Sequence, residues 1–160
     1  GVDDRMLYLF DTYEGMPAPD EVDVDFMGRP AADEFRNRRI SDVSSTWVNA
    51  SLGSVKHAMS LTGYPEKNMV FVKGMVEETI PESAPESIAL LRLDTDWYQS
   101  TKHELNHLYS RVPRNGVVVI DDYGWFRGAR QAVDEFFAER GINPYLHRVD
   151  YTARLIIKDE

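Results

Sequence analysis

Two short apolar runs in the chain end in carboxylates, and acids placed in this way could bind a metal ion or move a proton. Residues 90–93 lead into two aspartates, and residues 117–120 lead into two more. A short apolar run that stops in Asp is typical of a buried strand that delivers acidic side chains to one edge of a sheet. The four acids expected at that edge are Asp94, Asp96, Asp121 and Asp122.

Carboxylates that meet at one sheet edge repel one another, and this repulsion raises their pKa values unless a cation or a basic group neutralises them. Oxygen ligands at a partly open site suit magnesium. We therefore predict that Asp94, Asp121 and Asp122 bind Mg²⁺ and that Asp96 is a further ligand or a general base. The competing interpretation is that each Asp only caps a turn or a helix. Arg92 is interpreted as an ordinary ion-pair residue at the sheet edge rather than as a partner of the acids.

Alternating strands and helices must position these acids. Strands are predicted where short apolar runs are bounded by Gly, Pro or Asp, and helices where apolar residues recur with helical spacing. The predicted strands are 6–10, 69–72, 88–93, 117–120, 145–149 and 154–157, and the predicted helices are 52–62, 101–112 and 128–140. This order favours an α/β fold with a parallel, doubly wound sheet, helices on both faces and an antiparallel strand pair at the end. In such sheets ligands bind beyond the carboxyl ends of the strands.

Local signals refine three segments. Ser51 is predicted to cap the first helix, and Thr101 with Glu104 matches a capping box that would begin the second. Residues 18–46 show no sustained period, so we predict a long functional loop or lid there, with functionless disorder as the alternative. Residues 77–86 are predicted to form a loop with at most one helical turn.

Residues 103–107 match the H-E-x-x-H pattern of zinc peptidases, in which two histidines one helical turn apart bind zinc. The apolar face of this predicted helix lies opposite His103 and His107. We therefore expect both histidines to face solvent and treat a zinc peptidase as a weak alternative. Neither His57 nor His147 is an evident third ligand.

Asp11 ends the first predicted strand and has two competing interpretations. At the end of a strand in a nucleotide-binding sheet, an acid can accept hydrogen bonds from both hydroxyls of a ribose. Alternatively, Asp11 forms a turn before Glu14 and Gly15. Aromatic residues that flank the other acids could line an apolar wall for a substrate or an adenine, or could fill the core. These residues are Trp97, Tyr98, Tyr123, Trp125 and Phe126.

The 160 residues carry a formal charge of -9 and no cysteine. The negative charge argues against nucleic acid as a partner, because binding to phosphates depends on Lys and Arg. The lack of cysteine excludes disulfides, a thiolate nucleophile and a Cys-bound zinc. No apolar run approaches the ~18 residues of a membrane span, and no signal segment opens the chain. We therefore expect a cytoplasmic enzyme without a membrane partner; whether it forms a homo-oligomer is left open.

Several motifs resemble the macrocin O-methyltransferase family, the S-adenosylmethionine-dependent sugar O-methyltransferases of antibiotic biosynthesis. The motifs are Phe10-Asp11-Thr12-Tyr13-Glu14-Gly15-Met16-Pro17, Lys73-Gly74, Leu91-Arg92-Leu93-Asp94-Thr95-Asp96-Trp97-Tyr98-Gln99-Ser100-Thr101, Ile120-Asp121-Asp122-Tyr123-Gly124 and Ala129-Arg130-Gln131-Ala132-Val133. The resemblance implies a Rossmann-like class I methyltransferase that uses S-adenosylmethionine and Mg²⁺ to methylate a hydroxyl of a small-molecule acceptor. It also implies Asp11 and Thr12 at the cofactor ribose, Gly74 and Met75 near adenine, Asp94, Asp121 and Asp122 as magnesium ligands, and Asp94 or Asp96 as the base.

One departure from the family concerns its first strand and the glycine-rich turn that follows it, neither of which is found in this sequence. In the family this strand lies between the strand of Asp11 and the strand of Asp94. We expect residues 1–160 to be a single, truncated methyltransferase domain with a lid at about 18–46, in preference to a rearranged sheet or a strand supplied by a partner. The cofactor affinity of this chain is then expected to be poor even with an intact metal site. A non-catalytic methyltransferase-like binding domain is the main alternative function.

Overall fold

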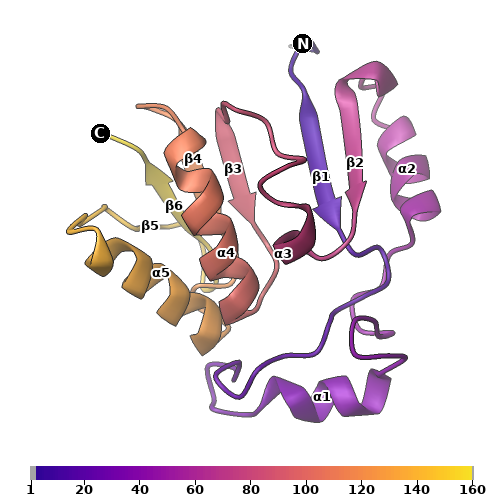
Figure 1. Cartoon of the computed structure of the whole chain (residues 1–160), viewed down its shortest axis with the longest axis vertical. Helices are drawn as coiled ribbons and strands as arrows, with labels where there is room; N and C mark the ends of the chain where they lie inside the picture. The colour runs from indigo at the N-terminus through magenta and orange to yellow at the C-terminus, as the bar shows by residue number, and fades with distance from the viewer. Residues whose placement is uncertain (1–2, 160) are drawn as a thin grey trace. The chain divides into compact units, whose positions relative to one another are not determined.

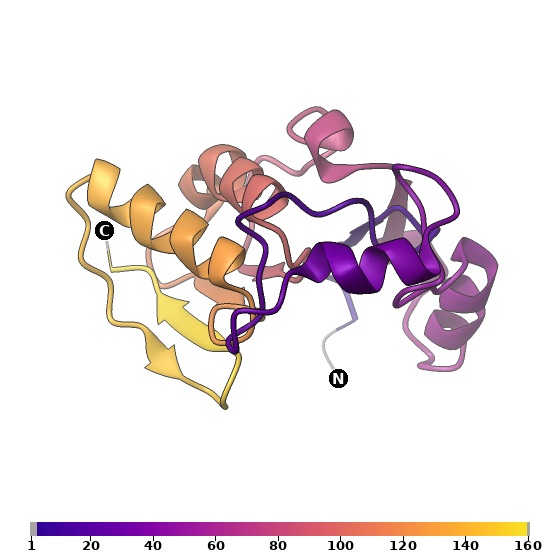
Figure 2. The same ribbon diagram turned by 90° about the horizontal axis from the view of Figure 1, so that it is seen from below.

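The structure, a computed structural model, describes residues 3–159 and divides them into two compact units. The first unit contains the chain up to residue 18 together with residues 35–83, and the second contains residues 19–34 together with the chain from residue 84 onward. Each unit has its own sheet, so the strands predicted for one continuous sheet lie in two. The ribbon is shown in Figures 1 and 2.

The first unit is built on two parallel strands, β1 (Leu7–Asp11) and β2 (Met69–Lys73), with Leu9 opposite Phe71. Parallel strands need a crossover connection. Part of this connection is α2 (Leu52–Ser60), whose first turn is capped as predicted, because the Ser51 side chain accepts a hydrogen bond from the Ser54 backbone N–H. A short 3₁₀ turn (Glu66–Asn68) leads into β2, and the single helical turn predicted after it is α3 (Val76–Thr79).

The second unit has four strands in the order β3 (Leu90–Leu93), β4 (Val117–Ile120), β6 (Arg154–Ile157) and β5 (His147–Arg148). The first two strands are parallel, and β4–β6 and β6–β5 are antiparallel. The predicted antiparallel pair at the end of the chain is therefore confirmed. The sheet as a whole is mixed.

Two helices cover one face of this four-stranded sheet. They are α4 (Tyr98–Leu108), which continues into a 3₁₀ turn (Tyr109–Arg111), and α5 (Arg127–Glu139), and Figures 1 and 2 show them packed side by side. The sheet residues beneath them are buried: Leu91, Leu93, Val118, Ile120 and Ile156. On the other face, Leu90 is 63% exposed and Ile157 is 61% exposed. The prediction of helices on both faces is thus wrong for this unit.

The start of α4 differs from its predicted position. The helix begins at Tyr98, so Thr101 lies inside it rather than at its N-cap. Thr101 and Glu104 are both buried, and Glu104 accepts a hydrogen bond from the Thr95 hydroxyl at 2.9 Å instead of closing a capping box. The capping-box prediction was wrong because a match at two positions does not fix where a helix begins. The N-cap is Trp97, whose side chain does not cap the helix.

The segment predicted as a loop or lid contains a helix, α1 (Ala31–Arg38). Its apolar signal consists of two buried residues one turn apart, Ala31 and Phe35, which is too short a period to recognise in a sequence. The boundary between the two units falls inside this helix, between Glu34 and Phe35. Residues 18–46 are therefore shared by both units, and their role as a lid stays a prediction.

Candidate functional site

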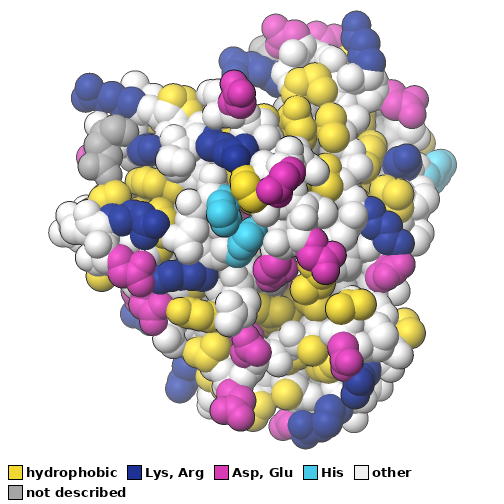
Figure 3. Space-filling view, viewed as in Figure 1, with side chains coloured by type: hydrophobic (Ala, Val, Ile, Leu, Met, Phe, Trp, Pro, Cys, Tyr) yellow, Lys and Arg dark blue, Asp and Glu magenta, His cyan; other side chains and the backbone are white. Residues whose placement is uncertain are grey.

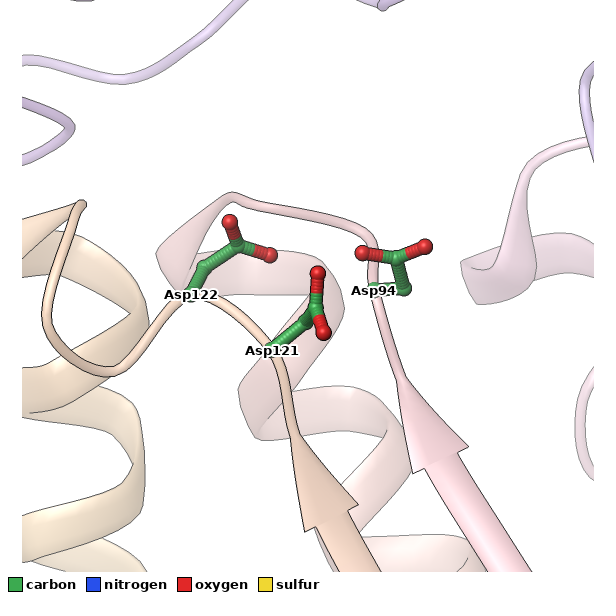
Figure 4. A group of neighbouring side chains, drawn as sticks. All are labelled: Asp94, Asp121 and Asp122. Atoms are coloured by element: carbon green, nitrogen blue, oxygen red, sulfur yellow. The ribbon is translucent and has the colours of Figure 1, made fainter. Parts of the chain in front are cut away.

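Three of the predicted acids lie together at the carboxyl ends of two adjacent strands. Asp94 follows β3, and Asp121 and Asp122 follow β4; each offers a carboxylate oxygen, and these oxygens lie within 4.8 Å of one another. Figure 4 shows the three carboxylates gathered beyond the strand ends. The register explains the proximity, because Leu93 pairs with Ile120 and the Asp121 N–H donates to the Leu93 carbonyl at 3.0 Å. We refer to Asp94, Asp121 and Asp122 as the acidic triad.

Arg92 is a direct partner of the acidic triad, so its interpretation as an ordinary sheet-edge residue is corrected. Its guanidinium lies 2.8 Å from Asp94 Oδ2 and 3.2 Å from Asp121 Oδ2. Arg92 lies on β3 two residues before Asp94, which follows the strand end, and its guanidinium reaches the carboxylates beyond that end. One guanidinium offsets part of the charge of three carboxylates and leaves a net negative site.

Asp94, Asp96 and Asp122 have raised pKa values. Burial, and next a hydrogen bond with Asp121, raises the pKa of Asp94 to about 7. Burial, and next a hydrogen bond with Asp122, raises the pKa of Asp96 to about 10. Burial also raises the pKa of Asp122. Without a bound cation, the folded protein therefore retains protons on these acids at pH values where exposed carboxylates have lost them.

Asp96 is joined to the acidic triad through Asp122 rather than being one of its members. Its backbone has a positive φ of 68°, a conformation that non-glycine residues rarely adopt. Hydrogen bonds hold the surrounding turn: the Trp97 N–H donates to the Thr95 carbonyl at 2.8 Å, and the Ser100 hydroxyl donates to the same carbonyl at 3.2 Å. The turn that carries Asp94 and Asp96 is therefore held firmly by the first residues of α4.

The residues predicted to bind the cofactor lie together in the first unit. Asp11 pairs with Lys73 across β1 and β2, and the Gly74 N–H donates to the Asp11 carbonyl at 3.1 Å. Gly74 has a φ of +144°, which favours glycine, and Met75 follows it at the start of α3. Asp11, Thr12, Gly74 and Met75 thus share one end of the two-stranded sheet. The acidic triad belongs to the other unit.

The Asp11 carboxylate also takes part in a turn, as its second interpretation predicted. Asp11 Oδ1 accepts hydrogen bonds from the Tyr13 N–H and, at 3.5 Å, from the Thr12 hydroxyl. The Thr12 hydroxyl is 2.8 Å from the Gly15 carbonyl oxygen. Gly15 is required here, because a Cβ would lie 2.1 Å from the Ser45 carbonyl oxygen and φ is +81°. Both contacts of Asp11 engage the same oxygen, so its role toward a ribose stays a prediction.

The aromatic residues near the acids divide into two groups. Trp97 and Phe126 are buried and pack edge to face at a centroid distance of 5.0 Å, so they fill the core. Trp125 is only partly buried and contacts Phe26 at 4.9 Å and Tyr151 at 6.2 Å. Phe26 and Tyr151 are 51% and 67% exposed, so this second group is available to a ligand.

The two histidines of the zinc-peptidase pattern lie on α4 with their rings 4.4 Å apart, and Figure 3 shows two adjacent histidine side chains at the surface. Both His103 and His107 are partly buried rather than fully in solvent. The apolar face opposite them is buried as predicted, at Leu105, Leu108, Tyr109 and Val112. Within residues 3–159, the group of side chains arranged to hold a metal ion is the acidic triad, and these histidines are not part of it.

No helix in the described part of the chain combines the length and apolarity needed to cross a membrane.

Proteins of known structure share this fold. The fold matches that of the O-methyltransferase NovP with a TM-score of 0.81 at 24% identity, over 99% of this chain and 62% of that one. It also matches CalS11, a calicheamicin methyltransferase, with a TM-score of 0.65 at 19% identity, over 96% of this chain and 60% of that one. The chain is therefore an α/β protein with the fold of an O-methyltransferase.

The chain matches the macrocin O-methyltransferase (TylF) family over residues 1–157 and belongs to that family. It is 28% identical over 149 residues to mycinamicin III 3''-O-methyltransferase of Micromonospora griseorubida, covering 93% of this chain and 56% of the relative. It is 30% identical over 148 residues to 8-demethyl-8-(2,3-dimethoxy-alpha-L-rhamnosyl)-tetracenomycin-C 4'-O-methyltransferase of Streptomyces olivaceus, covering 92% of this chain and 53% of the relative. The chain spans about half the length of these curated relatives.

Proposed function

We propose that the chain provides the metal-binding residues and part of the cofactor-binding residues of an S-adenosylmethionine-dependent, magnesium-dependent O-methyltransferase. The acceptor is a hydroxyl of a small sugar or natural product, as the names of the relatives indicate for those proteins. The observation that carries the proposal is the acidic triad, with carboxylate oxygens within 4.8 Å of one another in a chain of this family. All three donors are hard oxygen ligands, which fits magnesium.

In this proposal Asp94, Asp121 and Asp122 hold Mg²⁺, which supplies positive charge that lowers the pKa of the acceptor hydroxyl and orients it. Arg92 stays beside Asp94 and Asp121 and offsets the remaining negative charge. Asp94 or Asp96 accepts the hydroxyl proton on a carboxylate oxygen.

The cofactor side of the proposal rests on the end of the two-stranded sheet. Asp11 accepts hydrogen bonds from the ribose hydroxyls through Oδ2, because Oδ1 already accepts a hydrogen bond from the Tyr13 N–H. Thr12 lies beside it, and Gly74 and Met75 border the adenine. Methyl transfer needs the hydroxyl oxygen and the sulfonium methyl in line, so orientation by these residues supplies much of the rate enhancement.

The acceptor is proposed to lie against the partly exposed rings of Phe26, Trp125 and Tyr151. Trp125 follows Asp122 by three residues, and its N–H donates to the Asp122 carbonyl at 3.0 Å. An apolar wall beside a polar reacting centre is the usual composition of a small-molecule site. A cytoplasmic location and the lack of a nucleic-acid partner remain predictions.

Calorimetry tests the proposal directly. The chain is titrated with MgCl₂, and then with S-adenosylmethionine in the presence and absence of magnesium. We expect magnesium binding and weak cofactor binding that magnesium strengthens. Magnesium binding without any cofactor binding would contradict the claim that this chain is itself an enzyme, and would favour the second candidate, a non-catalytic methyltransferase-like binding domain.

A further inference from the structure

Asp23 is a buried carboxylate that caps a helix far from it in sequence. Its side chain is 1% exposed, and Oδ1 accepts a hydrogen bond from the Tyr98 N–H at 2.8 Å. Tyr98 begins α4, and the side chain of the local N-cap, Trp97, does not cap the helix. Asp23 therefore satisfies an N–H of the first turn that would otherwise lack a partner from its own segment.

Asp23 also lies against the start of α5. A Cβ on Gly128, in the first turn of α5, would lie 1.9 Å from Asp23 Oδ1, so only glycine leaves room for this carboxylate. The next residue, Val24, accepts a hydrogen bond at its carbonyl from the Arg127 N–H at 2.9 Å. Asp23 and Val24 thus contact the first residues of both helices.

Asp23 is linked to the acidic triad through the starts of these two helices. The turn that carries Asp94 and Asp96 leads directly into α4, and the loop that carries Asp121 and Asp122 leads into α5. Each of the two connections runs from a strand to a helix. Residues 23 and 24 contact the helix end of each connection, and the acidic triad lies at the strand ends. A shift of either helix start moves the carboxylates that precede it.

We propose that Asp23 is a positioning residue that fixes the turn of Asp94 and Asp96 relative to the loop of Asp121 and Asp122, and thereby sets the magnesium affinity of the acidic triad. The inference rests on the proposed function for its metal and on the contacts above for its geometry. Residues that orient metal ligands without touching the metal typically contribute about 10- to 100-fold to affinity. Burial also raises the pKa of Asp23, because an ionised carboxylate is costly at a buried position. If capping α4 were the only role of this position, a neutral side chain would fill it at a lower cost in free energy.

The test compares side chains that keep or lose the acceptor oxygen. Asp23→Asn keeps one acceptor oxygen for the Tyr98 N–H but places an NH₂ group where Oδ2 accepts a hydrogen bond from the Asp20 N–H at 2.9 Å. Asp23→Ser is shorter and leaves the Tyr98 N–H without this partner. Gly128→Ala disturbs the same junction from the α5 side. Glu21→Gln, on an exposed residue of the same segment, is the matched control. Thermal unfolding first establishes which variants are folded.

Two quantities are measured in each folded variant: the magnesium dissociation constant by calorimetry, and amide hydrogen exchange at Tyr98 and Asp121. For Asp23→Ser and Gly128→Ala we expect exchange to rise at both amides and magnesium affinity to fall by about tenfold or more. Glu21→Gln should resemble the parent. Asp23→Asn, which keeps the acceptor for the Tyr98 N–H, should change both quantities less than Asp23→Ser does. Faster exchange at Tyr98 alone, with Asp121 unchanged, would overturn the inference and leave Asp23 as a cap.

The amide at Asp121 separates this inference from the proposed function. Its N–H bonds the Leu93 carbonyl, so it reports the link between the two loops without any metal. If the parent chain binds no magnesium, the proposed function fails, while exchange at Asp121 still decides whether Asp23 positions the loops.

Discussion

The acidic triad holds like charges close together, and burial together with neighbouring carboxylates raises the pKa values of Asp94 and Asp122. Asp94, Asp121 and Asp122 stand on two strand ends whose spacing the sheet fixes, so they cannot move apart to relieve repulsion. Arg92 offsets only part of the charge. The site can lower its free energy by binding protons or by binding a cation, and the two compete.

Removing two members of the triad should abolish magnesium binding. We expect Asp121→Asn with Asp122→Asn to leave no measurable binding by calorimetry, because one carboxylate with waters holds Mg²⁺ only weakly. The control is Asp20→Asn with Glu21→Gln, which removes two negative charges from exposed side chains. Unchanged affinity in the first double variant would refute the ligand assignment.

The pKa of Asp94 predicts how stability depends on pH. An unperturbed Asp loses its proton near 3.8, whereas the folded protein holds it to about 7. Over this window the folded state binds more protons than the unfolded state, so the free energy of unfolding falls as pH rises. In EDTA, the thermal midpoint should therefore be lower at pH 8 than at pH 5, and magnesium should raise it more at pH 8. In Asp94→Asn the pH difference should shrink; an undiminished difference would contradict the role of this group.

The sequence located the acids of the site but not the residues that hold them. Asp94, Asp121 and Asp122 were recognisable because each ends an apolar run, which is a local pattern. Arg92 was misjudged, since only the pleat and register show that its guanidinium reaches two of the acids. Asp23 carried no signal at all, because its partner lies 75 residues away and its burial depends on Gly128.

At the scale of the elements, the strands and the starts of α2 and α5 were predicted to within two residues, whereas the start of α4 was predicted three residues too late and α1 was not predicted. Most of the strands are apolar runs, and the predicted limits of all six agree with the structure to within one or two residues. The start of α4 is set partly by Asp23 from another segment, and α1 by a single pair of buried residues. The strand of Asp11 and the strand of Asp94 lie in different sheets, which agrees with the expectation that the family's strand between them is missing from this sequence.

The two faces of β6 offer a direct test of which side of the sheet forms the core. Ile156 is 1% exposed and lies beneath the helices, whereas Ile157, its neighbour, is 61% exposed. Ile156→Ala should lower the free energy of unfolding by about 2 to 5 kcal/mol. Ile157→Ala should change it by less than about 0.5 kcal/mol. Chemical denaturation of both variants measures the difference; equal losses would contradict this placement of the core.

At the scale of the whole molecule, the two units differ in how much apolar surface they bury. Neither β1 nor β2 has a buried residue, and α2 has none either. The second unit buries complete side chains such as Leu105, Val118 and Phe136. A two-stranded sheet without a buried face has little independent stability.

Native-state hydrogen exchange should therefore show unequal protection. We expect amides of β1 and β2 to exchange through local opening, and amides of β4 and α5 to require nearly complete unfolding. Mass spectrometry of peptic fragments after timed labelling measures both. Equal protection in the two units would contradict the difference in burial.

The partly bare face of the four-stranded sheet has a consequence for the protein in concentrated solution. Among the described residues, β3 pairs only with β4 and leaves its other edge open, next to the exposed side chain of Leu90. An open edge beside apolar surface attracts other copies, while a net charge of -9 keeps them apart. Dissolved salt weakens the repulsion and leaves the attraction, so raising the ionic strength should lower the amount of this chain that stays in solution.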